Sequence, residues 1–97
     1  MKLEWDERKR VANWRKHGLD FALARELFNA EPLRVPDTQE DYGEERWIAI
    51  GQIKGRVVTA AFVERGADTI RILSLRKASR KEKQTYYSHF PDRLGPD

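Results

Sequence analysis

The 97-residue sequence contains no cysteine, which excludes a disulfide framework, a thiol nucleophile and a cysteine-type zinc site. Its two histidines, His17 and His89, are far apart and lack the spacing of paired zinc ligands. The glycines stand singly, so no glycine-rich loop is available to bind phosphate, and no nucleophile-elbow motif of a serine hydrolase is present. The acidic segment 37–45 does not have the ligand order of an EF-hand and is more typical of a solvated loop. We therefore expect neither a metal nor a cofactor.

Long hydrophobic runs are also missing. The longest, residues 57–63, is interrupted by Thr59 and is far too short to span a membrane. The first residues lack the apolar core of a signal peptide. We expect a soluble cytoplasmic protein with no membrane partner. The length suits one small domain, residues 1–90 with a short tail at 91–97, and is too small for a Rossmann or TIM-barrel fold.

The charge is distributed unevenly along the chain. Residues 1–50 carry nine Lys and Arg against eleven Asp and Glu, whereas residues 51–97 carry ten against five. Between Arg71 and Lys83 there are six positive charges and one negative charge. A basic segment of this kind indicates an anionic partner such as nucleic acid, although a solvated helix face that is rich in Lys and Arg has the same composition.

The N-terminal third of the sequence is typical of helices. A short strand or ordered segment at 2–5 precedes Asp6, which suits a helix N-cap, and the helix that it starts is expected to end before Gly18. Asp20 caps a second helix, which has an amphipathic stripe and ends before Pro32.

From residue 33 the period becomes strand-like. Strands are predicted at 33–35, 46–53, 56–65 and 69–75, and the last three, joined by short turns, form an antiparallel meander. The S-x-x-E spacing of Ser79 and Glu82 is a capping box that opens a third helix. The sequence therefore predicts an α+β fold. It has an antiparallel sheet of three to four strands, two N-terminal helices and one C-terminal helix, and the helices are packed on one face of the sheet.

A reaction that fits this composition is RNA cleavage by the substrate's own 2′-hydroxyl. It requires a base, cations that stabilise the charged transition state and a donor for the leaving 5′-oxygen. Arginines suit the second task because they bind phosphate oxygens in a bidentate manner. We expect Arg65, Arg71 and Arg76, together with Lys77, to converge on one edge of the sheet. Glu64, His17 and the tyrosines are candidate proton carriers, and composition does not select among them.

Each candidate also has a structural interpretation. The arginines can pair with carboxylates such as Glu64 or Asp68, and Arg46 can join the site or pair with Glu44 or Glu45. Lys16 and His17 can complement the C-terminal dipole of the first helix. Of the two tyrosines Tyr86 and Tyr87, one is expected in the core, and the other is expected to stack on a base or to donate a proton. The three tryptophans, Trp5, Trp14 and Trp47, are expected in the core.

Several short motifs, taken in order, resemble the BrnT toxin family. They cover about residues 3–87, and their order and spacing together are specific although each one alone is weak. The N-terminal block is Trp5-Asp6-Glu7, Asn13, Lys16-His17-Gly18, Phe21 and Ala24, and the second block is Glu45-Arg46 with Ile50-Gly51. The C-terminal block is Glu64-Arg65-Gly66, Ile70 to Ser74, Arg76-Lys77-Ala78, and Glu82 with Tyr86. Leu75 departs from the pattern, because the family commonly has a small residue there.

The resemblance implies a type II toxin with a RelE-like fold, a ribonuclease that arrests translation. It implies a BrnA-like antitoxin that has a ribbon-helix-helix part. The pair would bind operator DNA only through this antitoxin. Because such antitoxins pair, an assembly of two toxins and two antitoxins is expected. The expected site has Arg65, Arg71, Arg76, Glu64 and His17 in catalysis and Lys16, Arg46, Lys77 and Tyr86 in substrate binding. Two other functions use the same basic face: a non-catalytic nucleic-acid-binding module and a protein that binds an acidic partner.

Overall fold

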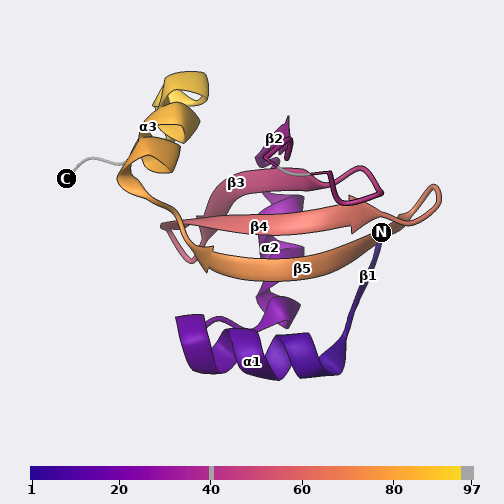
Figure 1. Cartoon of the computed structure of the whole chain (residues 1–97). Helices are drawn as coiled ribbons and strands as arrows, with labels where there is room; N and C mark the ends of the chain where they lie inside the picture. The colour runs from indigo at the N-terminus through magenta and orange to yellow at the C-terminus, as the bar shows by residue number, and fades with distance from the viewer. Residues whose placement is uncertain (40, 95–97) are drawn as a thin grey trace.

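A computed structural model describes residues 1–39 and 41–94 of the chain. Within them the elements are, in order, β1 (Lys2–Trp5), α1 (Glu7–His17), the 3-10 turn η1 (Phe21–Leu23), α2 (Ala24–Asn29), β2 (Leu33–Pro36), β3 (Trp47–Ile53), β4 (Arg56–Glu64), β5 (Thr69–Lys77), α3 (Arg80–His89) and the 3-10 turn η2 (Pro91–Arg93). Figure 1 shows α1 and α2 on one side of a twisted sheet and α3 at the end of the sheet where β5 finishes. The predicted α+β class is confirmed.

The sheet has five strands in the order β1-β5-β4-β3-β2. The predicted number, three to four, is too low, because β1 and β2 both join the meander as edge strands. The sheet is also mixed, since β1 pairs with β5 in parallel, from Lys2 opposite Thr69 to Trp5 opposite Ile72. A parallel pair requires a long connection, here the whole chain between β1 and β5, so local sequence patterns do not reveal it.

Local signals at the helix ends work as expected. The Asp6 side chain accepts hydrogen bonds from the backbone at the start of α1, and Gly18 ends the helix in the left-handed conformation with φ of 72°. Ser79 and Glu82 form the predicted capping box at the start of α3. These signals depend only on neighbouring residues, which is why the sequence predicts them well.

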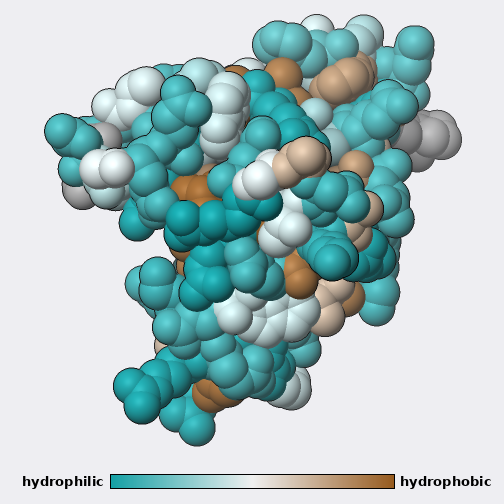
Figure 2. Space-filling model, turned by 90° about the vertical axis from the view of Figure 1, so that its right-hand side faces the viewer, coloured by the Kyte–Doolittle hydropathy of each residue, from teal (hydrophilic) through white to brown (hydrophobic). Residues whose placement is uncertain are grey.

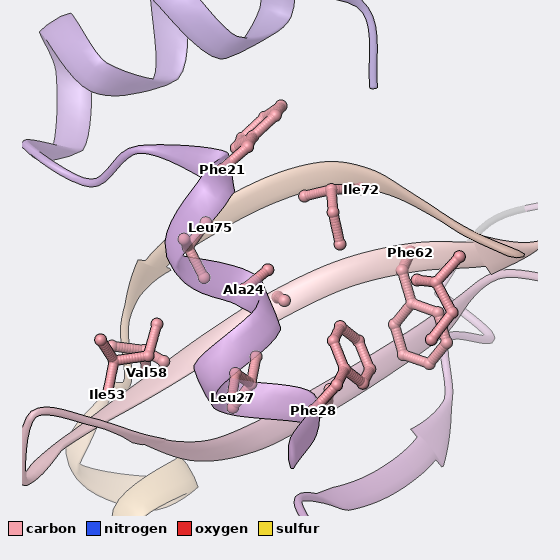
Figure 3. Close-up of a cluster of buried hydrophobic side chains, with 12 residues drawn as sticks. Phe21, Ala24, Leu27, Phe28, Ile53, Val58, Phe62, Ile72 and Leu75 are labelled. Atoms are coloured by element: carbon pink, nitrogen blue, oxygen red, sulfur yellow. The ribbon is translucent and has the colours of Figure 1, made fainter. Parts of the chain in front are cut away.

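The main core lies between the sheet and the layer formed by α1 and α2. Apolar side chains from η1 and α2 pack on the inner faces of β3, β4 and β5 (Figure 3). The labelled members are Phe21, Ala24, Leu27, Phe28, Ile53, Val58, Phe62, Ile72 and Leu75. Phe28 and Phe62 meet edge to face, with ring centroids 5.0 Å apart.

A second cluster lies on the opposite face of the sheet, beneath α3. It consists of Ile50, Val57 and Tyr86, with Phe90 and Tyr87 packed against it. The prediction that all helices cover one face is therefore wrong: α1 and α2 cover one face, and α3 covers one end of the other. The alternation along β4 explains this, because Val57 and Val58 are both buried but point to opposite faces.

Two further predictions are corrected at the periphery. Trp5 and Trp47 pack against the core as expected, but Trp14 is 54% exposed. The segment predicted as a tail is held on the domain at Arg93, which donates to the Glu31 carbonyl at 2.8 Å and to the Tyr86 hydroxyl at 3.0 Å. Glu40 of the acidic segment and residues 95–97 of the predicted tail lie outside the described residues.

Candidate functional site

The face of β4 and β5 opposite α1 and α2 carries two arginines, Arg71 and Arg76. Both lie on this face because their cross-strand partners on β4, Val63 and Thr59, also do. These partners are four residues apart, which corresponds to about 13 Å along the strand. Between the two arginines the register pairs Ala61 with Ser74, and a bulge leaves Leu73 without a partner on β4, so two small side chains and one leucine lie between them. We call this surface the arginine face.

Each arginine on this face is held by one carboxylate. Arg71 lies 3.7 Å from a carboxylate oxygen of Glu4, its neighbour on β1. Arg76 donates from both terminal nitrogens to the two oxygens of Glu82, at 2.8 and 2.9 Å. The Thr59 hydroxyl donates to the same carboxylate at 3.1 Å, so Glu82 joins α3 to both β4 and β5. These hydrogen bonds fix the guanidinium plane of Arg76, whereas Arg71 makes a looser ion pair.

The Arg76–Glu82 pair is the strongest electrostatic interaction on the arginine face. Burial raises the pKa of Glu82, but the hydrogen bonds from Arg76 and from the Ser79 backbone outweigh it and lower the pKa to about 2. The hydrogen bonds to Glu82 in turn raise the pKa of Arg76. Glu82 therefore stays ionised at neutral pH and serves to orient Arg76 rather than to transfer protons.

Arg65 and Arg46 lie at the end of the sheet away from α3. Arg65 approaches Glu44 at 3.4 Å, and Arg46 is 4.0 Å from the other oxygen of the same carboxylate. The Arg46 guanidinium also stacks on the Tyr42 ring, 3.9 Å from its centroid. Glu44 thus joins the loop before β3 to the end of β4.

The predicted convergence of the cations on one edge is corrected by these positions. The cations are spread along the sheet, and each of the three predicted catalytic arginines has an acidic partner, although not Glu64 or Asp68. Their side chains remain accessible, with exposed fractions of 49% for Arg65, 31% for Arg71 and 40% for Arg76. A phosphate can therefore reach these arginine side chains from solvent without the ion pairs having to break.

Two predicted proton carriers lie away from the arginine face. Glu64 pairs with Arg34 at 3.7 Å, and Arg34 lies over Phe28 on the side of the sheet covered by α2. His17 ends α1, next to the exposed Lys16, on that same side. His17 does share a cavity with Lys77, of about 410 Å³, so the structure brings these two predicted residues together at the sheet end nearest α3.

One of the two tyrosines lies in the core, as expected, but it is Tyr86, the residue that was assigned to substrate binding. Tyr86 is fully buried, and its hydroxyl accepts from Arg93. It leaves no ring face for a base, so that assignment is wrong. Tyr87, half-buried on α3, accepts a hydrogen bond from Gln52 at 3.4 Å and lines a surface cavity.

Sequence analysis missed Glu4, Arg56 and Lys83. Glu4 lies beside Arg71 only because β1 pairs with β5 in parallel, a contact between residues 67 positions apart. Arg56 and Lys83 are ordinary exposed cations in the sequence and meet only in the tertiary structure, in the cavity that Tyr87 lines. No local pattern could have identified either set.

On the side of the molecule shown in Figure 2, hydrophilic residues cover most of the surface and hydrophobic residues form small separate patches. Among the described residues, no group of three or more His, Asp or Glu side chains is arranged to hold a metal ion. In the same part of the chain, no helix has the length and apolar character needed to cross a membrane.

Comparisons with known proteins agree on one family. Residues 5–82 match the family model described as the ribonuclease toxin BrnT of a type II toxin–antitoxin system. The chain is also similar to the 1.1 Å crystal structure of the Brucella abortus ribonuclease toxin BrnT, with 34% sequence identity and a TM-score of 0.64. That match covers 82% of this chain and 99% of the Brucella chain. A search of curated proteins gave no match.

Proposed function

Because this chain belongs to the BrnT family of type II toxin–antitoxin ribonucleases, we propose that it cleaves RNA on the arginine face, without a metal, and thereby arrests translation. The observation that carries the site is the placement of Arg71 and Arg76 on one face, on either side of the small residues Ala61 and Ser74. An RNA backbone lying between them meets a guanidinium on each side. Arginine stays charged at any working pH and binds phosphate oxygens through paired donors.

The proposed reaction is a transesterification. A base removes the proton of the 2′-hydroxyl, and the 2′-oxygen attacks the adjacent phosphorus. The bond from phosphorus to the 5′-oxygen then breaks, and a donor protonates that oxygen. The products are a 2′,3′-cyclic phosphate and a free 5′-hydroxyl. Arg71, beside the assigned base Glu4, stabilises the negative charge that develops on the phosphoryl oxygens. Arg76, about 13 Å away along the strand, contacts a neighbouring phosphate, and Arg65 and Arg46 contact the backbone farther along.

The structure supports a different proton acceptor from those named from the sequence. Glu4 is a carboxylate on the arginine face, 3.7 Å from Arg71 and partly exposed. Glu64 makes a similar pair with Arg34, also at 3.7 Å, but on the side of the sheet that α2 covers. We therefore assign the base to Glu4, and His17 remains a candidate proton donor only for RNA that reaches the cavity it shares with Lys77.

These matched pairs allow a direct test of the site. Arg71→Ala should reduce cleavage of RNA by the purified protein about 100-fold or more, as loss of a transition-state donor does. Arg34→Ala, which removes the same kind of ion pair from the other side, should leave cleavage unchanged. Cleavage that survives Arg71→Ala, or an equal loss in Arg34→Ala, would contradict the assignment.

The carboxylates are tested in the same way. Glu4→Gln should abolish cleavage, while Glu64→Gln should retain it. The reverse result would return the base to Glu64 and refute the assignment to Glu4. Thermal unfolding of each variant shows whether a loss of cleavage reflects a loss of folding.

We further propose that a BrnA-like antitoxin with a ribbon-helix-helix part neutralises this toxin. The assembly would contain two copies of each protein and bind operator DNA only through the antitoxin. Expression of this chain alone should stop growth and the incorporation of labelled amino acids. Co-expression with the adjacent small gene should restore both, and continued arrest with the antitoxin present would contradict the proposal.

A further inference from the structure

A surface cavity at the end of the sheet nearest α3 contains cations that have no acidic partner among the described residues. It has a volume of about 470 Å³, and its lining includes Arg56, Lys77, Lys83 and Tyr87. We call it the hairpin groove, because Arg56 directly follows the turn between β3 and β4. In Figure 1 this turn, the end of β5 and the start of α3 lie together at one end of the sheet.

The hairpin groove differs electrostatically from the arginine face. In the part of the chain that the structure describes, its lining residues include no carboxylate. Within residues 1–39 and 41–94, the side chains of Arg56, Lys77 and Lys83 take part in no ion pair. Arg65, Arg71 and Arg76, in contrast, each have a carboxylate within 4 Å. Three uncompensated positive charges around one cavity create a local site for an anion.

Tyr87 adds an aromatic surface to these charges. Its position is fixed by the hydrogen bond from Gln52 and by an edge-to-face contact with the buried Tyr86, at a centroid distance of 5.2 Å. Lys83 and Tyr87 are four residues apart on α3 and therefore project from the same side of the helix. A ring beside several cations suits single-stranded nucleic acid, in which bases stack and phosphates pair.

The groove continues onto the other side of the sheet. A second cavity, of about 410 Å³, also includes Arg56 and Lys77 in its lining and adds Lys54 and His17. Lys77 directly follows Arg76, so the hairpin groove begins where the arginine face ends. RNA that leaves the arginine face at Arg76 therefore meets Lys77 and Arg56, which line both cavities at the end of the sheet.

We propose that the hairpin groove binds single-stranded RNA next to the cleavage site, with Arg56, Lys77 and Lys83 on phosphates and Tyr87 stacked on a base. This inference rests on the proposed ribonuclease function, since it names where the substrate of that reaction is held. An acidic protein segment is the competing ligand, but acidic side chains would not stack on the half-buried ring of Tyr87. The ring favours nucleic acid.

The test measures binding without cleavage. The probe is a fluorescent 2′-O-methyl oligonucleotide, which lacks the free 2′-hydroxyl and cannot be cut by the proposed reaction. Its affinity for the full chain is measured by anisotropy over a range of salt concentrations. Each phosphate contact to a single strand contributes about 0.7 to the slope of log K against log salt. Combined replacement of Arg56, Lys77 and Lys83 by Ala should therefore lower this slope by about 2.

The control variant removes the same charge elsewhere. Arg8, Lys9 and Arg15 are exposed on α1, and their combined replacement by Ala should leave the salt slope near that of the wild type. Tyr87→Ala should weaken binding about tenfold without changing the slope, because stacking does not release counterions. Circular dichroism of every variant confirms that the fold is intact.

The results separate this inference from the proposed function. If wild-type protein cuts RNA but the groove variant binds the oligonucleotide as tightly as the control variant, the groove inference is overturned and the ribonuclease stands. If the oligonucleotide binds through the groove but RNA is never cut, the inference stands as a binding site and the ribonuclease fails. If groove substitution abolishes binding of a poly-glutamate peptide but not of the oligonucleotide, the groove is a protein-binding site and the inference is overturned.

Discussion

Asn13 is the residue whose replacement should damage the fold most clearly. It lies on α1 and is only 8% exposed. Its side-chain amide donates to the Leu75 carbonyl at 2.8 Å and accepts from the Leu75 N–H at 3.1 Å. It also donates to the Leu19 carbonyl at 3.0 Å. The pairing of β1 with β5 ends at Ile72. Beyond this point no strand lies on the side of β5 away from β4 in the described structure, and Asn13 instead bonds the backbone N–H and C=O of Leu75.

Asn13→Ala leaves two buried backbone groups of Leu75 without partners. At about 1–3 kcal/mol for each buried unsatisfied group, we expect the free energy of unfolding to fall by about 3 kcal/mol. Such a loss is a large part of the ~5–15 kcal/mol that stabilises a typical domain. The melting temperature should fall by about 12–24 °C, at about 4–8 °C for each kcal/mol.

Urea unfolding followed by tryptophan fluorescence measures this change. Asn29→Ala, at the exposed end of α2, is the matched control and should change stability by no more than about 0.5 kcal/mol. If Asn13→Ala is as stable as Asn29→Ala, the amide does not satisfy the edge of β5 and the reasoning is refuted.

Three further predictions follow from the same structure. Glu82 has a lowered pKa in the folded state, so its contribution to stability is present above its ordinary value of 4.5 and is lost as the pH falls to about 2. The difference in unfolding free energy between wild type and Glu82→Gln should therefore shrink over that range, and a constant difference would count against the pair. Gly51→Ala places a Cβ 2.6 Å from Leu27 Cδ1 and 3.1 Å from Pro32 Cβ, and should cost about 1–3 kcal/mol in chemical denaturation; an unchanged midpoint would show that the core has room. RNA cleavage by the purified protein should continue in excess EDTA, and its loss would refute the metal-free mechanism.

The parts of the fold that depend on neighbouring residues could be predicted from the sequence. Asp6, Gly18 and the Ser79–Glu82 capping box set the helix ends through contacts within one turn. The alternation along β4 likewise assigned its two faces. The parallel pairing of β1 with β5 and the position of α3 depend on contacts between distant segments, which such patterns do not encode.

The candidate site was predictable only as a set of residue types. Arg71 and Arg76 were expected together and do lie on one face, but Glu4 and Glu82, which hold them, were not expected beside them. Glu64 was one of the candidate proton carriers, yet alternation along β4 turns its side chain to the face opposite Arg71 and Arg76. Successive residues of a strand point to opposite faces of the sheet, so two residues that are adjacent in the sequence, such as Glu64 and Arg65, need not share a site.

The chemistry of the RNA ends tests the central proposal most directly. Purified protein is incubated with a defined single-stranded RNA and with the same sequence carrying 2′-deoxy nucleotides, and the termini are identified by mass spectrometry. Attack by the 2′-hydroxyl predicts fragments with 2′,3′-cyclic phosphate and 5′-hydroxyl ends from the RNA and no cleavage of the deoxy strand. Fragments with 3′-hydroxyl and 5′-phosphate ends, or cleavage of both strands, would contradict it.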